Sequence, residues 1–404
     1  MGTTLAAVLV ATGLAAAIVG SVVGAAVDPL PTPLVTPAAL GSGMYALASA
    51  PDGAPYLSWL EPVPGGHALK FSRLDGATWA EPREIAHGDN WFVNWADHPT
   101  LAALPNGSLV AHWLANNGDK SGHYGYGFRI ALSNDKGRRW HEIHAGGTDN
   151  VTGYSGFVSL LPTTGGFEAV FLGPPKPPGP TDDPEHIMML SALRFDTDGR
   201  LQSRAVADAN TCSCCSTSIV QTSRGPLAAY RDRAAGEIRD ISVVRLESGR
   251  WTEPRTVYPD GWQINACPTN GPALAASGSR VAISWFTGAA GVPRLKAAFS
   301  TDAGDHFSAP TTIDLGRPVG WPATSLLDDG SAVVSWLESK GDGRGELLMR
   351  RVASNGRLGA PVRVAETSSG RSTGIPQMVR VRDRLLLAWR TDRVQTALVP
   401  IPNF

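Results

Sequence analysis

A short apolar run that ends in an aromatic residue recurs seven times along the chain, at intervals of about 55 residues. Each run follows a tight turn and a start marked by Pro or Gly. A repeat of this length made of short strands is typical of a radial array of small sheets, because each sheet needs neighbours to bury its faces. The repeat therefore predicts an all-β fold, a β-propeller. The aromatic residues are Trp59, Trp113, Phe171, Tyr230, Trp285, Trp336 and Trp389.

The stretch 98–145 shows what one unit contains. Four apolar runs lie in it, separated by turn residues such as Pro105-Asn106-Gly107, and this is the pattern of a four-stranded antiparallel blade. The four runs are Pro99–Ala103, Ser108–Leu114, Gly127–Ser133 and His141–Ala145.

Seven such units form one propeller domain over residues 28–404. The last unit shows only three strands, and the apolar segment Thr32–Leu40 precedes the first full unit. We therefore expect Thr32–Leu40 to supply the missing strand and to close the ring, which leaves no free sheet edge at the seam. A six-bladed ring with one degenerate unit is the alternative. The blades are expected near residues 43–87, 98–145, 156–207, 215–257, 270–314, 322–365 and 374–400.

The first 27 residues have a different character from the rest of the chain. No charged residue occurs from Leu5 to Val27, and small apolar residues dominate. This pattern is typical of a signal peptide, or of a membrane anchor if the segment is retained. We expect an exported protein, periplasmic or extracellular, that contacts a membrane only through this segment.

The formal net charge of the chain is −1, so the sequence shows no electrostatic signature of nucleic-acid binding. Propellers bind ligands where their innermost strands converge. A small molecule or glycan in the axial funnel is therefore the expected partner. The sequence leaves the oligomeric state open.

Two turns carry the pattern S-x-D-x-G-x-x-W/F, at Ser133–Trp140 and Ser300–Phe307. Their Asp side chains can bond backbone N–H groups of the same turn, and their Gly residues suit a left-handed conformation. These turns resemble the Asp-box, or bacterial neuraminidase repeat. They join the third and fourth strands of a blade, so we expect them to be scaffold on the face opposite the funnel.

All four cysteines fall in loops that lead into inner strands, on the predicted funnel face. Cys212, Cys214 and Cys215 precede the fourth blade, and Cys267 has the corresponding position before the fifth. In an exported protein they could form disulfides. They could also bind copper or zinc as thiolates, with His98 or His123 as extra ligands, or remain free thiols.

A dense group of charges surrounds the hairpin from Tyr230 to Asp240. It can be an internal ion-pair network, or it can recognise an anionic substrate through arginine forks. Asp97 beside His98 is a candidate acid–base pair. Trp95 and Trp262 could stack on a sugar ring or pack between blades. The charged residues are Arg231, Asp232, Arg233, Arg239 and Asp240, with Arg390 as a further candidate for binding a carboxylate.

With its Asp-boxes and blade period, the chain resembles the sialidase-like propeller superfamily over about residues 40–400. It is most similar to an uncharacterised exported bacterial group with four shared segments. The family holds a substrate carboxylate with three arginines, one of them in an F/Y-R-I-P phrase. The nearest analogue here is Thr373-Gly374-Ile375-Pro376, with Gly in the arginine position, which argues against sialidase activity. The shared segments are Asn90–Asp97, Cys212–Cys215, Tyr230–Asp240 and Cys267–Pro272.

Three functions therefore remain open. The first is a glycosidase or binder of acidic glycans, in which Asp97 or Asp232 is the acid/base and Tyr124 or Tyr230 the nucleophile. The second is a non-hydrolytic propeller with a cysteine-cluster metal or redox site at the axis. The third is a protein-interaction scaffold stabilised by disulfides. Fold analogy alone does not choose among them.

Overall fold

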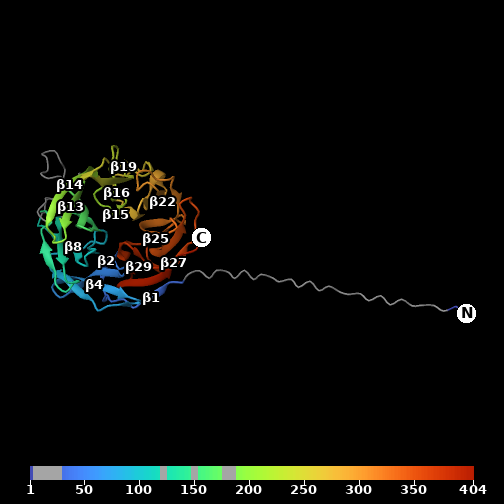
Figure 1. The fold of residues 1–404 in the computed structure, drawn as a ribbon, viewed down its shortest axis with the longest axis horizontal. Helices are drawn as coiled ribbons and strands as arrows, with labels where there is room; N and C mark the ends of the chain where they lie inside the picture. The colour runs from blue at the N-terminus through green and yellow to red at the C-terminus, as the bar shows by residue number, and fades with distance from the viewer. Residues whose placement is uncertain (3–29, 119–124, 147–152, 175–187) are drawn as a thin grey trace.

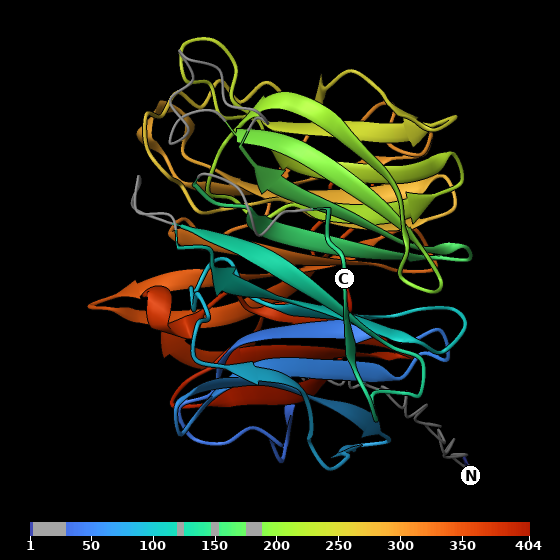
Figure 2. The same cartoon turned by 90° about the vertical axis from the view of Figure 1, so that its left-hand side faces the viewer.

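The computed structural model describes residues 1–2, 30–118, 125–146, 153–174 and 188–404. Seven antiparallel sheets surround one axis and form a seven-bladed β-propeller (Figure 1). Neighbouring innermost strands contact one another all the way around the ring. The side view in Figure 2 shows the sheets stacked around this axis. The prediction of seven blades is confirmed, and the six-bladed alternative is wrong.

The first three blades follow the expected repeat. In the first blade the outermost position is shared by two short strands, β5 and β6, which both pair with β4. The strands are β2 (Gly43–Ser49), β3 (Pro55–Val63), β4 (Gly66–Asp75), β5 (Thr78–Trp79) and β6 (Arg83–Gly88); β7 (Thr100–Ala103), β8 (Leu109–Asn116), β9 (Tyr126–Ser133) and β10 (His141–Ile143); and β11 (Gly156–Thr163), β12 (Gly166–Gly173), β13 (Met188–Asp196) and β14 (Leu201–Thr211).

Blades four to six have the same order, and the fourth also divides its outermost position between two short strands. The strands are β15 (Ser218–Thr222), β16 (Gly225–Arg231), β17 (Ile241–Glu247), β18 (Arg250–Trp251) and β19 (Arg255–Thr256); β20 (Ala273–Ser277), β21 (Arg280–Thr287), β22 (Arg294–Ser300) and β23 (Thr311–Thr312); and β24 (Pro318–Leu326), β25 (Ala332–Gly341), β26 (Arg344–Val352) and β27 (Val362–Ser368). Two short 3₁₀ turns are η1 (Ala289–Gly291) and η2 (Arg371–Thr373).

The seventh blade joins the two ends of the chain. It consists of β28 (Gln377–Val381), β29 (Arg384–Arg390), β30 (Val394–Pro400) and β1 (Thr32–Leu34). The N-terminal strand β1 pairs antiparallel with β30, so the ring closes as predicted. The closing strand is shorter than the expected Thr32–Leu40.

Hydrophobic clusters lie at every junction between neighbouring blades. In the described residues there are seven, and each combines side chains from two adjacent sheets. The repeated aromatic residues sit on the second strands, and Trp59, Trp285 and Trp336 are fully buried there. Burial between sheets accounts for the spacing of the aromatic residues in the sequence, because each blade covers its faces with its neighbours.

The two Asp-box turns are scaffold, as predicted. In the turn between β9 and β10, Asp135 Oδ1 accepts hydrogen bonds from the N–H groups of Arg138 and Arg139, at 3.0 and 2.9 Å. Ser133 Oγ accepts a third from the N–H of Gly137 at 2.8 Å. Trp140 then packs edge-on against Phe71 of the first blade. The Ser133 and Asp135 side chains thus bond backbone N–H groups of their own turn, and Trp140 contacts the neighbouring blade.

The predicted leader or anchor over residues 1–27 lies outside the described residues, apart from its first two. Within the described part of the chain, no helix has the length and apolar character needed to cross a membrane.

Candidate functional site

The innermost strands enclose an axial channel with a cavity volume of about 730 Å³. The strands run parallel to one another around this channel, and the loops that enter them form its mouth. Asp97, His98, Phe157, Thr217 and Trp321 line the wall at that end. Two candidates from the sequence, Asp97 and His98, therefore do face the channel.

Three inner strands begin with the same irregularity. Near the start of β2, β11 and β24, a β-bulge follows a glycine (the first residue of β2 and β11, the third of β24), and the residue after that glycine has a positive φ. The residue in this strained position is Met44, Phe157 or Trp321, with φ of 47°, 54° and 54°. A bulge redirects side chains at the end of a strand, and backbone strain of this kind gathers at ligand sites. The bulges thus place large side chains at the mouth.

Asp97 is buried under the mouth. Its Oδ2 accepts a hydrogen bond from the Tyr126 hydroxyl at 2.8 Å, and its Oδ1 accepts one from the N–H of Phe157, also at 2.8 Å. Burial raises the pKa of Asp97 to about 7, and these two hydrogen bonds limit the rise. A carboxyl group with this pKa can gain or lose a proton near neutral pH.

His98 does not form the expected acid–base pair with its neighbour, since no hydrogen bond joins it to Asp97 in the described structure. Burial lowers the pKa of His98 to about 4, and that of His112 on β8 to about 3. Both imidazoles are therefore neutral near pH 7.

An aromatic pair and a guanidinium form the rim. The rings of Trp95 and Trp321 lie 5.2 Å apart, and the guanidinium of Arg371 lies over the Trp95 ring at 5.5 Å. Trp321 is fixed by hydrogen bonds from its N–H to Asn270 Oδ1 and from its Nε1–H to the Thr269 carbonyl. Trp95 is half-buried and Arg371 is exposed, so both are accessible at the mouth.

Arg371 has no anionic partner among the described residues, since no ion pair includes it. It belongs to η2, whose last residue, Thr373, begins the segment Thr373–Pro376. Gly374, which stands where the sialidase phrase has an arginine, has a φ of 69°, and an added Cβ would lie 3.3 Å from the Tyr45 ring. A side chain there would be strained. The guanidinium at the mouth belongs instead to Arg371, three residues before Gly374.

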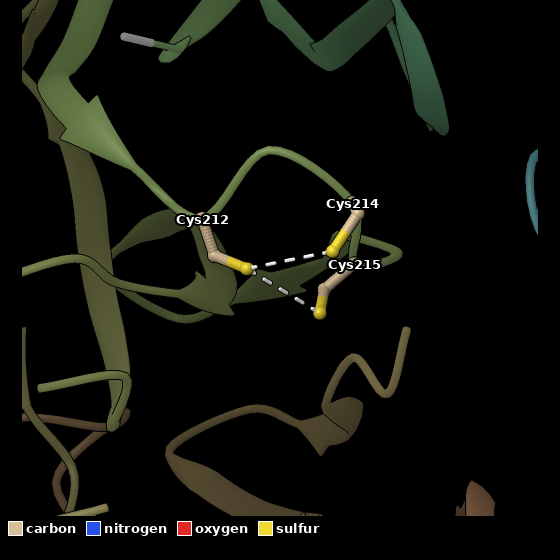
Figure 3. A group of neighbouring side chains, drawn as sticks. All are labelled: Cys212, Cys214 and Cys215. Atoms are coloured by element: carbon tan, nitrogen blue, oxygen red, sulfur yellow. Dashed lines mark hydrogen bonds between the residues drawn. The ribbon is translucent and has the colours of Figure 1, made fainter. Parts of the chain in front are cut away.

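The cysteines form the second part of this face. Cys212, Cys214 and Cys215 lie in the turn between β14 and β15, with their sulfurs turned toward one another (Figure 3). Sγ of Cys212 lies 3.8 Å from that of Cys214 and 3.7 Å from that of Cys215. All four cysteines of the chain are free thiols, so the structure does not support the disulfides that the sequence suggested.

Cys267 reaches this cluster from the loop before β20. Its thiol contacts that of Cys214 and the Ser213 side chain. It is exposed, whereas Cys212 and Cys215 are buried. Three sulfurs, those of Cys212, Cys214 and Cys215, are close enough together to be ligands of one metal ion, and His98 is not part of that group in the described structure.

Arg231 does not form the expected substrate clamp. It is 1% exposed, and its guanidinium donates hydrogen bonds to the backbone carbonyls of Asn270, Arg239 and Phe286 at 2.6 to 3.0 Å. It also lies 4.7 Å from the ring of Trp262, which is buried with it. Arg231 and Trp262 therefore connect the fourth and fifth blades, and neither is free to bind a sugar.

The other charges of the hairpin also pair internally. Glu237 accepts hydrogen bonds from both Arg233 and Arg239, one arginine at each carboxylate oxygen. Asp240 accepts the N–H groups of Gly261 and Trp262 at 2.9 and 3.0 Å. The ion-pair interpretation of this hairpin thus fits the structure better than substrate recognition.

Tyr230 and Asp232 lie between the third and fourth blades. The Tyr230 hydroxyl donates to Asp208, and burial raises the pKa of Tyr230 above its ordinary value. Burial also raises the pKa of Asp232, which accepts a hydrogen bond from Ser242. A buried tyrosine with a raised pKa is a poor nucleophile, so the structure argues against that role.

Arg390 is likewise used by the scaffold. Its Nε and Nη1 donate to the carbonyls of Ser42 and Ser372 at 2.8 Å, which fixes the seam of the ring. The two remaining candidates, Tyr124 and His123, lie outside the described residues.

Sequence reasoning missed Trp321 and Arg371. The pattern Gly-aromatic at the start of an inner strand, as in Gly320-Trp321, was a usable signal for the first. Nothing in the local sequence distinguished Arg371 from the other exposed arginines, since its position depends on η2 and on the packing of Gly374 against Tyr45.

No protein-family model and no curated protein matches this chain. Solved structures do match it. A protein of unknown function from Dyadobacter fermentans has a TM-score of 0.52 at 13% identity, over 93% of this chain and 98% of its own. A polysaccharide lyase described as an ulvan lyase, bound to -[GlcA(1-4)Rha3S]-, has a TM-score of 0.55 at 10% identity, over 92% and 94%.

The Hadza microbial sialidase Hz136 is a weaker match, with a TM-score of 0.41 at 14% identity, over 74% of this chain and 63% of its own. Likeness at such low identity shows the fold alone. The chain is a seven-bladed propeller, and the solved structures similar to it in fold include a polysaccharide lyase. The four-segment resemblance to an exported bacterial group remains a prediction.

Proposed function

We propose that the protein binds an acidic glycan at the mouth of the axial channel. The observation that carries this proposal is the exposed guanidinium of Arg371 over the face of Trp95, with no anionic partner among the described residues. A carboxylate or sulfate group on the sugar would pair with Arg371, and the ring of the sugar would stack on Trp95.

Two further features support this class of ligand. Trp321 is held rigidly beside Trp95, so the aromatic surface is preorganised and loses little conformational entropy on binding. The ulvan lyase with the same fold was solved with a glucuronate-containing sulfated sugar, which makes an acidic glycan a reasonable first ligand.

Asp97 is the candidate catalytic group at this site. Its carboxyl group lies at the channel wall with a pKa of about 7, and it accepts a hydrogen bond from Tyr126. If the glycan is cleaved, Asp97 is the group that would exchange a proton with it. The variant Asp97→Asn would then lose turnover and still bind the sugar.

Export is part of the same proposal, because acidic polysaccharides are extracellular substrates. The uncharged segment from Leu5 to Val27 supports it. Sequencing the N-terminus of the protein recovered from the cell envelope and the medium tests whether the segment is removed.

The binding test uses calorimetric titration of the purified full chain. The ligands are oligosaccharides of ulvan, oligogalacturonate and sialyllactose, with arabinobiose as a neutral control. We expect one acidic ligand to bind and arabinobiose not to bind. Because each change removes a charge-assisted contact or a stacking surface, Arg371→Ala and Trp95→Ala should each weaken binding by about tenfold or more.

The matched control is Arg233→Ala, since this arginine is already paired with Glu237. That variant should bind the acidic ligand with unchanged affinity. Failure of all three acidic ligands to bind would contradict the proposal. So would binding that survives both Arg371→Ala and Trp95→Ala.

A further inference from the structure

The cysteine cluster has the spacing of a metal site. Around an ion with metal–sulfur bonds of about 2.3 Å, tetrahedral geometry places sulfurs about 3.8 Å apart. The two measured separations from Cys212 are 3.8 and 3.7 Å, to Cys214 and Cys215. A disulfide would need about 2.05 Å. The three sulfurs therefore surround a common centre without being bonded to one another (Figure 3).

Two loops supply the four sulfurs. Cys212 and Cys215 are separated by two residues, a spacing that recurs in zinc sites. Cys267 comes from the equivalent loop of the next blade, and its thiol contacts that of Cys214. Cys267 is not among the three sulfurs that already lie together, so its exposed side chain would have to turn toward them to become the fourth ligand. A bound ion would thus join the loops that enter the fourth and fifth blades.

The surroundings of the cluster suit negatively charged sulfur. The N–H of Cys214 donates a hydrogen bond to the Cys212 sulfur, and the guanidinium of Arg239 contacts the same sulfur. The positive charge of Arg231 also acts on the Cys215 thiol, and the hydrogen bonds of this guanidinium go to backbone carbonyl groups. A buried guanidinium without a carboxylate partner is stabilised by a nearby anion, and metal-bound thiolates would supply one for Arg231.

We propose that Cys212, Cys214, Cys215 and Cys267 bind one thiophilic closed-shell ion, Zn(II) or Cu(I). The first three sulfurs form the buried part of the site, and Cys267 completes it from the exposed side. The ion holds the rim of the channel together between two blades. This site is separate from the glycan contact at Trp95 and Arg371.

The test starts from reduced, chelator-treated full-length protein under anaerobic conditions. Zn(II) and Cu(I) are each titrated against a chromophoric chelator, and Co(II) serves as a spectroscopic substitute for Zn(II). We expect one equivalent of Zn(II) or Cu(I) to bind and to raise the melting temperature, since binding to the folded state stabilises it. Co(II) should show the intense visible bands of tetrahedral thiolate coordination.

Variants locate the ligands. Cys267→Ser, at an exposed position, should fold and still bind one equivalent, with affinity lowered at least tenfold and an altered Co(II) spectrum. Cys212→Ala should lose binding. Ser216→Ala, next to the cluster but without a sulfur, is the matched control and should bind like the unaltered chain. Zn(II) binding without Cu(I) binding, or the reverse, identifies the ion.

Two results would overturn the proposal. One is the absence of stoichiometric binding of either ion to reduced, folded protein. The other is binding that raises no melting temperature and is unchanged in both cysteine variants, because the ion would then be held elsewhere.

Discussion

Two turns that connect strands of this propeller satisfy their side chains in different ways. In the Asp-box turn Ser300–Phe307, Asp302 accepts hydrogen bonds from the N–H groups of Asp305 and His306, and Ser300 accepts one from Gly304. In the turn from Thr211 to Ser216, three thiols face one another, and Arg239 and Cys267 contact them from other segments.

This difference distinguishes a turn that is scaffold from a turn that is a candidate functional site. In the Asp-box, the side chains of Ser300 and Asp302 are satisfied by N–H groups of the same turn, so neither needs a ligand. The cysteine turn depends on Arg239 and Cys267, which are distant in the sequence, and it brings together groups that metal ions bind. The charged hairpin around Glu237 belongs with the Asp-box in this comparison, because its charges pair with one another.

The largest expected effect on stability is at Arg231, which the comparison assigns to the scaffold. Arg231→Met removes the buried hydrogen bonds to three carbonyls and should lower the free energy of unfolding by about 3 to 5 kcal/mol. Urea unfolding followed by tryptophan fluorescence measures this. A folded variant with unchanged stability but abolished glycan binding would show that Arg231 belongs to the ligand site.

Asp97 should make stability depend on pH. Its pKa is raised from 3.8 to about 7, so its stabilising contribution is complete below pH 4 and is lost as the pH rises to 7. Between pH 4 and pH 7, the free energy of unfolding of the unaltered chain should therefore fall by about 3 kcal/mol more than that of Asp97→Asn. Urea unfolding at several pH values measures the difference.

Tyr126→Phe is the control for this prediction. It removes a hydrogen bond that holds the pKa of Asp97 down, so the loss of stability should still begin near pH 4 but continue to higher pH. If Asp97→Asn changes stability equally at pH 4 and pH 7, the carboxyl group does not titrate in this range.

A smaller effect is expected in the Asp-box. Asp302→Ala leaves two turn N–H groups without their acceptor and should cost about 1 to 2 kcal/mol, as loss of a helix N-cap does. The pKa of Asp302 is lowered, so its contribution should be present above about pH 4 and fade as the pH falls below that value. Thermal unfolding of Asp302→Ala and of the unaltered chain, at pH 7 and at pH 3, measures both effects. A change in metal binding would contradict its assignment to the scaffold.

The smallest effect on stability is expected at the rim of the channel. Arg371→Ala removes an exposed guanidinium without an ion-pair partner in the described residues, and should change the unfolding free energy by less than about 0.5 kcal/mol. Calorimetric melting curves check this. A loss above 2 kcal/mol would make Arg371 a structural residue and weaken the glycan proposal.

The fold could be predicted because it rests on periodic, local signals. The aromatic residue of each second strand is buried between blades, and the turns that carry Gly and Asp close on themselves. The closing strand Thr32–Leu34 could be predicted because the last unit lacked one strand. These features can be predicted without knowing which side chains contact one another.

The site could be predicted only in part. The repeat placed Cys267 near the other cysteines, since equivalent loops of neighbouring blades lie side by side. It could not show that Arg231 would turn inward to backbone carbonyls, or that Arg371 would lie over Trp95. Those outcomes depend on packing between segments far apart in the sequence.

The most direct measurement is native mass spectrometry, with elemental analysis and thiol counting, on protein purified without added chelator or reductant. If the cysteine turn is completed by a bound ion, as we propose, the mass will exceed that of the polypeptide by one zinc or copper ion. Four thiols will then become alkylatable after chelation. A metal-free mass lowered by four hydrogens, with no alkylatable thiol, would show two disulfides and contradict the account.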